Sequence, residues 1–159
     1  MNYSLRRADN QDAELVAAID SAIFESQAWT LAMWQAELSQ SFNHIILAVP
    51  LDNSSKPIGF VSASILDNAI EIRKIGSLIP FRKKGVGLRC LEAVERLRQE
   101  HRKEKIILEV SEKNTSAIAF YQKNGFVTIS IRPRYYQDNS AAHCMAKSND
   151  KMLSAISPP

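Results

Sequence analysis

One stretch of the 159-residue sequence, from residue 69 to residue 110, limits the possible folds more than any other. It begins with a β-forming run, Ala69–Leu78, and ends with an apolar run, Lys105–Val110. Apolar residues recur at helical spacing between the two runs: Val86, Cys90, Ala93, Val94 and Leu97. Two strands that are joined through a helix are expected to lie parallel in one sheet. The sequence therefore predicts an α/β fold built around a parallel crossover.

Short strands and helices are predicted on both sides of this crossover. Strands are expected at residues 3–7, 42–49, 58–65, 126–131 and 141–146, and helices at residues 9–25, 30–39 and 114–124. Asp9 and Asn10 are candidate caps of the first helix, and Thr30 is the expected cap of the second. The polar segment 50–57 is expected to be the turn of a hairpin. The order βααβββαβαββ predicts a mixed (α/β or α+β) central sheet of about seven strands flanked by about four helices.

Length and composition bound the number of domains and the class of protein. We expect one domain over residues 1–147, followed by a flexible polar tail at residues 148–159. The formal net charge of +3 is small and its basic residues are dispersed, so nucleic acid is not an expected partner. Cys90 and Cys144 are too few for a disulfide framework or a metal cage, and the three histidines show no ligand spacing. Because no apolar run could serve as a bilayer span or a secretory leader, we expect a cytoplasmic protein that does not enter a membrane.

A basic turn with two glycines precedes the predicted helix of the crossover. Arg82, Lys83 and Lys84 come directly before Gly85-Val86-Gly87. The first turn of a helix leaves backbone N–H groups unpaired at its positive end, and glycine lets a phosphate approach the backbone closely. A pyrophosphate is therefore the guest that this turn favours. Taken alone, the pattern is better explained by a solvated basic turn, the commoner case.

Several motifs together resemble those of the GNAT superfamily of acetyltransferases. The basic turn is similar to its Arg/Gln-x-x-Gly-x-Gly coenzyme A motif, and Asn114–Phe126 resembles its closing motif. Leu5–Ala8 followed by Asp12 resembles its opening. Within the superfamily, the bacterial ribosomal-protein-alanine N-acetyltransferase (RimI-like) family is the most similar, on residues 28–30, 71–77, 108–110, 114–126 and 131–136. The resemblance covers about residues 3 to 147 and implies the GNAT fold, with a sheet splayed between its fourth and fifth strands.

The resemblance implies that acetyl-CoA binds to the basic turn and to the strand before it. No metal is expected, because His44, His101 and His143 show no ligand spacing. The implied coenzyme-binding residues are Ile75, Gly76, Ser77, Arg82, Lys83, Lys84, Gly85, Val86, Gly87, Leu88 and Asn114. Gly76 and Ser77 are small enough to leave room for the pantetheine arm, although a fraying strand end also explains them. Asn114 is equally explained as the N-cap of the helix that follows it.

Two residues that handle protons are also implied. Glu109 is the candidate base, and Tyr121 is the candidate acid for the leaving thiolate. Glu109 interrupts an apolar strand, so its carboxylate is either buried beside the site or directed to water. An α-amino group has an unperturbed pKa of about 8, so a carboxylate suffices to deprotonate it. Glu71 is the alternative base, and an ordinary packed tyrosine is the alternative interpretation of Tyr121.

The acceptor site is expected to involve three aromatic residues. Trp29, Tyr135 and Tyr136 are candidates for the walls of a groove for a peptide N-terminus, although core or rim packing explains them as well. Ser140-Ala141 stands where the family usually has an acidic pair, which bears on peptide selectivity.

Three functions are open. The first is direct acetyl transfer, in a ternary complex, to the N-terminal α-amino group of a protein, as in the ribosomal-protein alanine acetyltransferases. The second is transfer to a small-molecule amine or a lysine, and the third is a coenzyme A-binding module without catalysis. The presence of both Glu109 and Tyr121 favours an enzyme. The expected partners are acetyl-CoA and a protein N-terminus or other primary amine, and the chain is expected to be a monomer, with a dimer left open.

Overall fold

The computed structural model describes residues 2–52 and 56–148. The strands are β1 (Tyr3–Arg7), β2 (Asn43–Pro50), β3 (Gly59–Ile65), β4 (Ala69–Ser77), β5 (Lys105–Ser111), β6 (Val127–Arg132) and β7 (Ala142–Ser148). The α-helices are α1 (Ala13–Phe24), α2 (Leu31–Ser39), α3 (Val86–Glu100) and α4 (Thr115–Lys123), and the short 3-10 helices are η1 (Asn10–Asp12), η2 (Glu25–Gln27) and η3 (Ile79–Phe81). Every predicted helix and strand is present, and Thr30 and Asn114 are confirmed as N-caps.

Two predicted segments fall partly outside the described residues. The proposed tail lies beyond them except for Ser148, which belongs to β7. The middle of the predicted 50–57 turn, residues 53–55, also lies outside them. The chain divides into two compact units, residues 1–65 with 73–96 and residues 66–72 with 97–159. The expectation of a single domain over residues 1–147 stays a prediction.

Hydrogen-bonded strands follow the order β1-β2-β3-β4-β5-β7-β6. The pairs β1–β2, β2–β3, β5–β7 and β6–β7 are antiparallel, whereas β4 and β5 are parallel. The predicted parallel crossover and the mixed sheet of seven strands are therefore confirmed. The pairing of β4 with β5 joins Ala69–Ile72 to Lys105–Leu108, the first part of each strand, which fits the expected splay between the fourth and fifth strands.

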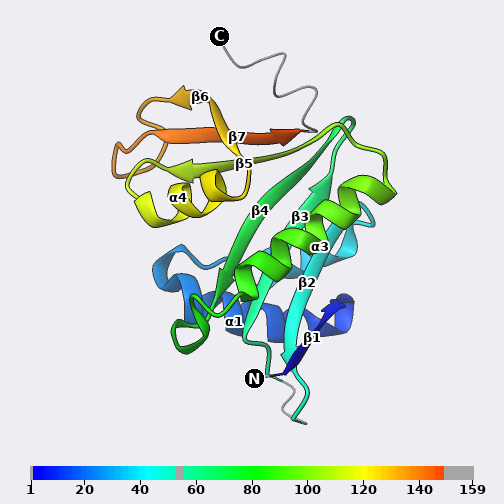
Figure 1. Ribbon diagram of the computed structural model, residues 1–159. Coiled ribbons are helices and arrows are strands. Elements are labelled where there is room, and N and C mark those ends of the chain that lie inside the picture. Colours follow the sequence, from blue (N-terminus) through cyan, green and yellow to red (C-terminus); the bar gives the residue numbers. More distant parts are fainter. Residues whose placement is uncertain (1, 53–55, 149–159) are drawn as a thin grey trace. The chain divides into compact units, whose positions relative to one another are not determined.

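In the first unit, α1 and α2 lie on one face of the strands and α3 lies on the other (Figure 1). Buried side chains of α1, α2, β2 and β3 form one cluster: Val16, Ile19, Trp34, Ile45, Leu47 and Phe60. Gly59 is the neighbour of Phe60 in β3 and faces the opposite way. A Cβ atom on Gly59 would lie 2.7 Å from Val86 Cγ1, so the start of α3 packs directly on the backbone of β3.

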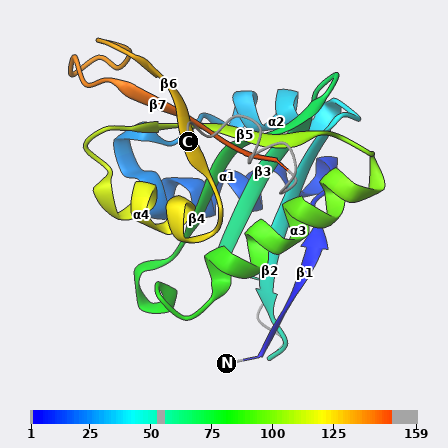
Figure 2. The ribbon, with the colours of Figure 1, turned by 45° about the horizontal axis from the view of Figure 1, so that its top comes forward.

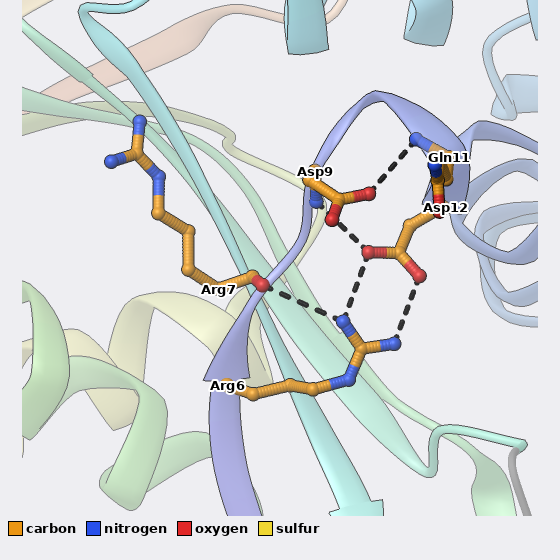
Figure 3. A network of polar contacts seen from close by, with 5 residues as sticks. All are labelled: Arg6, Arg7, Asp9, Gln11 and Asp12. Carbon is orange, nitrogen blue, oxygen red and sulfur yellow. Dashed lines mark hydrogen bonds and ion pairs between the residues drawn. The ribbon is translucent and has the colours of Figure 1, made fainter.

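A compact polar network fixes the connection from β1 to α1 (Figure 3). Arg6 donates two hydrogen bonds of 2.9 Å to the Asp12 carboxylate. Asp12 accepts from the backbone N–H of Asp9, and Asp9 accepts from the N–H of Gln11. This reciprocal pattern is a capping box. The predicted Asp9 cap therefore belongs to η1, and the opening motif of the sequence has a structural explanation.

In the second unit, β6 and β7 form a hairpin whose second strand pairs with β5 (Figure 2). Alternate residues of β5 are buried, namely Ile106, Leu108 and Val110, whereas Glu109 is exposed. This alternation gives β5 one buried face and one open face.

Candidate functional site

The basic turn, residues 82–88, presents its cations and its backbone to solvent. Arg82, Lys83 and Lys84 are all exposed. Gly85 has a φ of 86°, in the left-handed region that favours glycine. A Cβ atom built on Gly85 would meet nothing within 4 Å, so the space beside this backbone is open. The turn can therefore admit an anion close to its main chain.

The first turn of α3 adds backbone donors to these cations. Arg89 N–H donates to Gly85 O at 3.0 Å and is the first N–H bonded within the helix, so the N–H groups of Val86, Gly87 and Leu88 have no acceptor inside it. These N–H groups and the positive end of the helix dipole suit a pyrophosphate. Val86 is buried against β3 and holds the turn in place.

The end of β4 carries the residues expected beside the pantetheine arm. Ile75–Ser77 are half-buried. A Cβ atom on Gly76 would lie 2.9 Å from Ile23 Cγ2, so the missing side chain makes room for α1. The close approach of α1 thus gives a packing reason for this glycine. Leu78 N–H donates to Ile58 O at 2.9 Å, so the strand end does not fray at this residue.

Trp29 lies in the first unit, between η2 and α2. Its ring packs on Trp34 with centroids 4.6 Å apart and an interplanar angle of 34°. Its backbone N–H donates to the buried carboxylate of Asp20 at 2.7 Å. The packing interpretation of Trp29 is therefore confirmed, and its role toward the acceptor stays a prediction.

Glu109 lies on the open face of β5 in the second unit, with a side chain that is 31% exposed. Of the two alternatives left open by the sequence, the carboxylate directed to water is the one observed. The pairing of β4 with β5 sets Glu71 opposite Ile107, two residues before Glu109. Because paired residues and residues two apart share a face of a sheet, both candidate bases project from the same face. Glu71 is half-buried there.

Three residues at the end of β6 and in the following loop surround Glu109. Arg132 Nη1 lies 3.5 Å from Glu109 Oε1. A hydrogen bond to Glu109 raises the pKa of Tyr135, and burial, followed by the charge of Glu109, raises the pKa of Tyr136. The two tyrosine rings meet edge to face at 5.0 Å. The structure thus joins Glu109, Arg132, Tyr135 and Tyr136 in what we call the Glu109 cluster.

Two of the three predicted acceptor residues belong to this cluster. Sequence reasoning did not pair Arg132 with Glu109, because this contact joins two strands that are not consecutive in the sequence.

Tyr121 and Asn114 both belong to the α4 region. Tyr121 is 6% exposed and packs between Phe120 and Phe126, each ring centroid 5.5 Å away. Burial raises the pKa of Tyr121 well above its usual range, so the phenol keeps its proton at neutral pH. Asn114 Oδ1 accepts from Ala117 N–H at 3.2 Å, as the cap interpretation requires. The roles of both residues toward the coenzyme stay predictions.

The loop between β6 and β7 is held by contacts that the sequence did not reveal. The backbone N–H groups of Tyr135 and Tyr136 donate to Ser140 O at 3.0 and 3.2 Å. Asp138 accepts hydrogen bonds from the backbone and hydroxyl of Ser140, and it lies 3.1 Å from Lys113 Nζ. The bonds from Ser140, and then Lys113, lower the pKa of Asp138 to about 2. Ser140, a departure from the family pattern, therefore anchors this loop.

Neither a membrane-spanning helix nor a metal-binding group is present among the described residues. Over residues 2–52 and 56–148, no helix is long and apolar enough to cross a membrane. Within the same ranges, no group of three or more His, Cys, Asp or Glu side chains is arranged to hold a metal ion.

Residues 7–126 match the Acetyltransferase (GNAT) family. The chain belongs to this family. A solved structure with the GNAT fold, the ribosomal-protein-S18-alanine N-acetyltransferase from Escherichia coli, superposes with a TM-score of 0.82 over 92% of this chain and 94% of that one. The two sequences are 19% identical, so this likeness shows the fold alone. The predicted family and fold are confirmed.

Curated relatives of this GNAT chain include N-alpha-acetyltransferases. The one from Saccharolobus solfataricus is 35% identical over 46% of this chain and 44% of its own length. RimI from Mycobacterium tuberculosis is 27% identical over 82% of each chain. An uncharacterized protein from Mycobacterium leprae is 30% identical over 82% of this chain but only 36% of its own length. The chain thus spans less than half the length of two of these relatives. The two relatives with an assigned activity are N-alpha-acetyltransferases.

Proposed function

We propose that this GNAT chain transfers the acetyl group of acetyl-CoA to the N-terminal α-amino group of a protein. The observation that carries the proposal is the Glu109 cluster, an exposed carboxylate bordered by Tyr135 and Tyr136. A carboxylate in such a setting can take a proton from an ammonium group, directly or through one water. The N-alpha-acetyltransferases among the relatives support the same class of acceptor. An alanine terminus of a ribosomal protein and a cytoplasmic location are the finer parts of this proposal.

Acetyl-CoA is held by the basic turn and the end of β4. The exposed cations Arg82–Lys84 and the first N–H groups of α3, which precede its intrahelical bonds, fit the charge of a pyrophosphate. The open space beside Gly85 lets that group approach the main chain. Backbone groups of Ile75–Ser77 pair with the pantetheine arm, and Asn114 adds a contact while it caps α4.

Glu109 acts on the attacking amine, and Tyr121 acts on the leaving thiolate. The amine nitrogen attacks the thioester carbonyl carbon, the carbon–sulfur bond breaks, and Glu109 accepts the proton that the amine loses. Tyr121 donates a hydrogen bond to the departing thiolate. A tyrosine phenol is a weaker acid than a thiol, whose ordinary pKa is about 8.5, and burial raises the pKa of Tyr121 further, so the phenol stabilises the thiolate more readily than it transfers the proton. Glu71 is the alternative base on the same face of the sheet.

Acetylation of a peptide library tests the proposed acceptor. The chain is incubated with acetyl-CoA and peptides that differ in their first residue, beside matched peptides with a blocked N-terminus, free lysine and a polyamine. We expect acetyl transfer to free N-termini, including alanine, and little transfer to the blocked peptides. If only the blocked peptides, lysine or the polyamine were acetylated, the acceptor would be a side-chain or small-molecule amine, and the proposal of an N-terminal α-amino group would be wrong. Thermal stabilisation by acetyl-CoA with no transfer to any amine would indicate a binding module.

A further inference from the structure

A buried carboxylate joins four segments of the first unit. Asp20 of α1 is 0% exposed. Its Oδ1 accepts from Lys74 Nζ of β4 at 2.7 Å. Its Oδ2 accepts from the backbone N–H of Trp29 at 2.7 Å and from Trp34 Nε1 of α2 at 2.8 Å. Both oxygens of this buried carboxylate therefore accept hydrogen bonds, which offsets part of the cost of burying its charge.

Lys74 is enclosed by the connection between α1 and α2. Its side chain is 11% exposed. Its ammonium donates to Gln27 O at 3.0 Å and lies 4.7 Å from the Phe24 ring centroid and 4.9 Å from that of Trp29. Burial lowers the pKa of Lys74, while Asp20 acts in the opposite direction. An ammonium placed between a carboxylate, a carbonyl and two ring faces is held in one geometry.

Filling this space with side chains does not require a buried ion pair. Apolar side chains of similar volume would bury the same space without the cost of removing two charges from water. The pair differs from such residues in binding backbone groups of the connection, the carbonyl of Gln27 and the N–H of Trp29. It also supports the Trp29 ring, which rests on Trp34.

We infer that the Asp20–Lys74 pair positions Trp29 and, through Trp29, the acceptor amine; the inference rests on the proposed function. Lys74 directly precedes Ile75–Ser77, the segment proposed for the pantetheine arm. The pair therefore ties the aromatic residue proposed for the acceptor to the strand proposed for the coenzyme, inside one compact unit. Lys74 and Asp20 are positioning residues, since they act through Trp29.

Substitution of Lys74 tests the inference with two readouts. Trp29 and Trp34 are the two tryptophans of the chain, so tryptophan emission reports on this cluster alone. Lys74→Met removes the ammonium and keeps an unbranched stem. We expect shifted tryptophan emission and a KM for an alanine-first peptide raised about tenfold, with kcat and the KM for acetyl-CoA changed less than about twofold. Lys74→Arg should restore much of the peptide affinity, and Lys56→Met, at an exposed lysine of the same unit, should leave every value unchanged.

A double-mutant cycle shows whether Lys74 acts through Trp29. Trp29→Phe alone and Trp29→Phe with Lys74→Met should have the same KM for the peptide, because the residue that Lys74 positions is already gone. Independent, multiplying effects would overturn the inference. So would an unchanged peptide KM in a Lys74→Met enzyme that is folded and active.

A folding failure of the variant and a failure of the proposed function can each be distinguished from a failure of the inference. If Lys74→Met does not fold, Asp20→Asn with Lys74→Met leaves no unpaired buried charge, and the same rise in peptide KM is expected. A wild-type chain that acetylates no peptide would remove the proposed function, and the inference with it. An active wild type with no effect of the pair removes the inference alone.

Discussion

The basic turn of the first unit and the Glu109 cluster of the second are both exposed, but they are held in different ways. The turn is shaped by its main chain, through the left-handed Gly85 and the buried Val86. The Glu109 cluster is shaped by side chains, through the contacts of Glu109 with Arg132 and Tyr135. A region defined by backbone should be sensitive to substitution of its glycine and tolerant at its cations. A region defined by side chains should lose function with one functional group.

The largest expected effect is that of removing the carboxylate of the Glu109 cluster. Glu109→Gln keeps the size of the side chain but cannot accept the proton, so kcat for peptide acetylation should fall by about 10² to 10⁴. Steady-state kinetics with the alanine-first peptide measure this. Glu71→Gln, on the same face of the sheet, is the matched control, and it should lower kcat for peptide acetylation by less than about tenfold. The opposite ranking would make Glu71 the base, and two variants at wild-type rate would remove both carboxylates from the mechanism.

The next effect concerns the close packing of α1 on the end of β4. Gly76→Ala places a methyl group 2.9 Å from Ile23 Cγ2 and 3.1 Å from Phe24 Cζ. Overpacking of this kind costs about 1–3 kcal/mol, so the midpoint of denaturant unfolding should fall. Gly76→Ala with Ile23→Val shortens one of the opposing side chains and should recover part of the loss. An unchanged midpoint in Gly76→Ala would mean that α1 does not approach this strand so closely.

A smaller effect is expected at the basic turn itself. Gly85→Ala meets no atom within 4 Å, but it forces alanine to a φ of 86°, which costs about 1–2 kcal/mol. We expect a modest loss of stability and a higher KM for acetyl-CoA, because relief of the strain moves the N–H groups of the turn. Lys83→Met removes one exposed charge of the same turn and should leave the stability nearly unchanged. A larger rise in the KM for acetyl-CoA with Lys83→Met than with Gly85→Ala would show that charge, and not the main chain, defines the turn.

Local patterns in the sequence predicted the fold and the place of the basic turn. The alternation of β5, the helical spacing in α3 and the caps Thr30 and Asn114 depend on neighbouring residues, so one sequence is enough to show them. Contacts between distant residues could not be predicted in this way. The Asp20–Lys74 pair joins residues 54 positions apart, and no local pattern identifies Lys74 as the partner of Asp20.

The difference between local patterns and contacts of distant residues also applies to the Glu109 cluster. From the sequence alone, a glutamate in an apolar strand can lie on the buried or on the exposed face. Because Leu108 and Val110 on either side of Glu109 are buried, Glu109 lies on the exposed face. Sequence reasoning nevertheless found Glu109, Tyr135 and Tyr136, which the fold brings together. It did not predict the contact of Arg132 with Glu109 or the anchoring role of Ser140, because both depend on how β6, β7 and their loop fold.

The smallest expected effect is in that loop, where side chains hold the main chain beside the Glu109 cluster. The pKa of Asp138 is lowered from 3.8 to about 2, chiefly by hydrogen bonds from Ser140. A carboxyl whose pKa is lower in the folded than in the unfolded chain stabilises the fold fully above its unfolded pKa, and this contribution disappears as the pH falls through its folded pKa. The loop contacts should therefore persist at neutral pH and weaken only between about pH 4 and pH 2.

The carboxyl carbon resonance of Asp138, assigned with Asp138→Asn, measures this titration. Ser140→Ala should raise the titration midpoint of Asp138 more than Lys113→Met does, because the hydrogen bonds from Ser140 are the largest cause of its lowered pKa. At neutral pH, Lys113→Met should leave the peptide KM nearly unchanged, since Ser140 O still accepts from the backbone of Tyr135 and Tyr136. A midpoint near 4 in the wild type would mean that Asp138 does not hold this loop. The tyrosines beside Glu109 would then depend on their own contacts with that carboxylate.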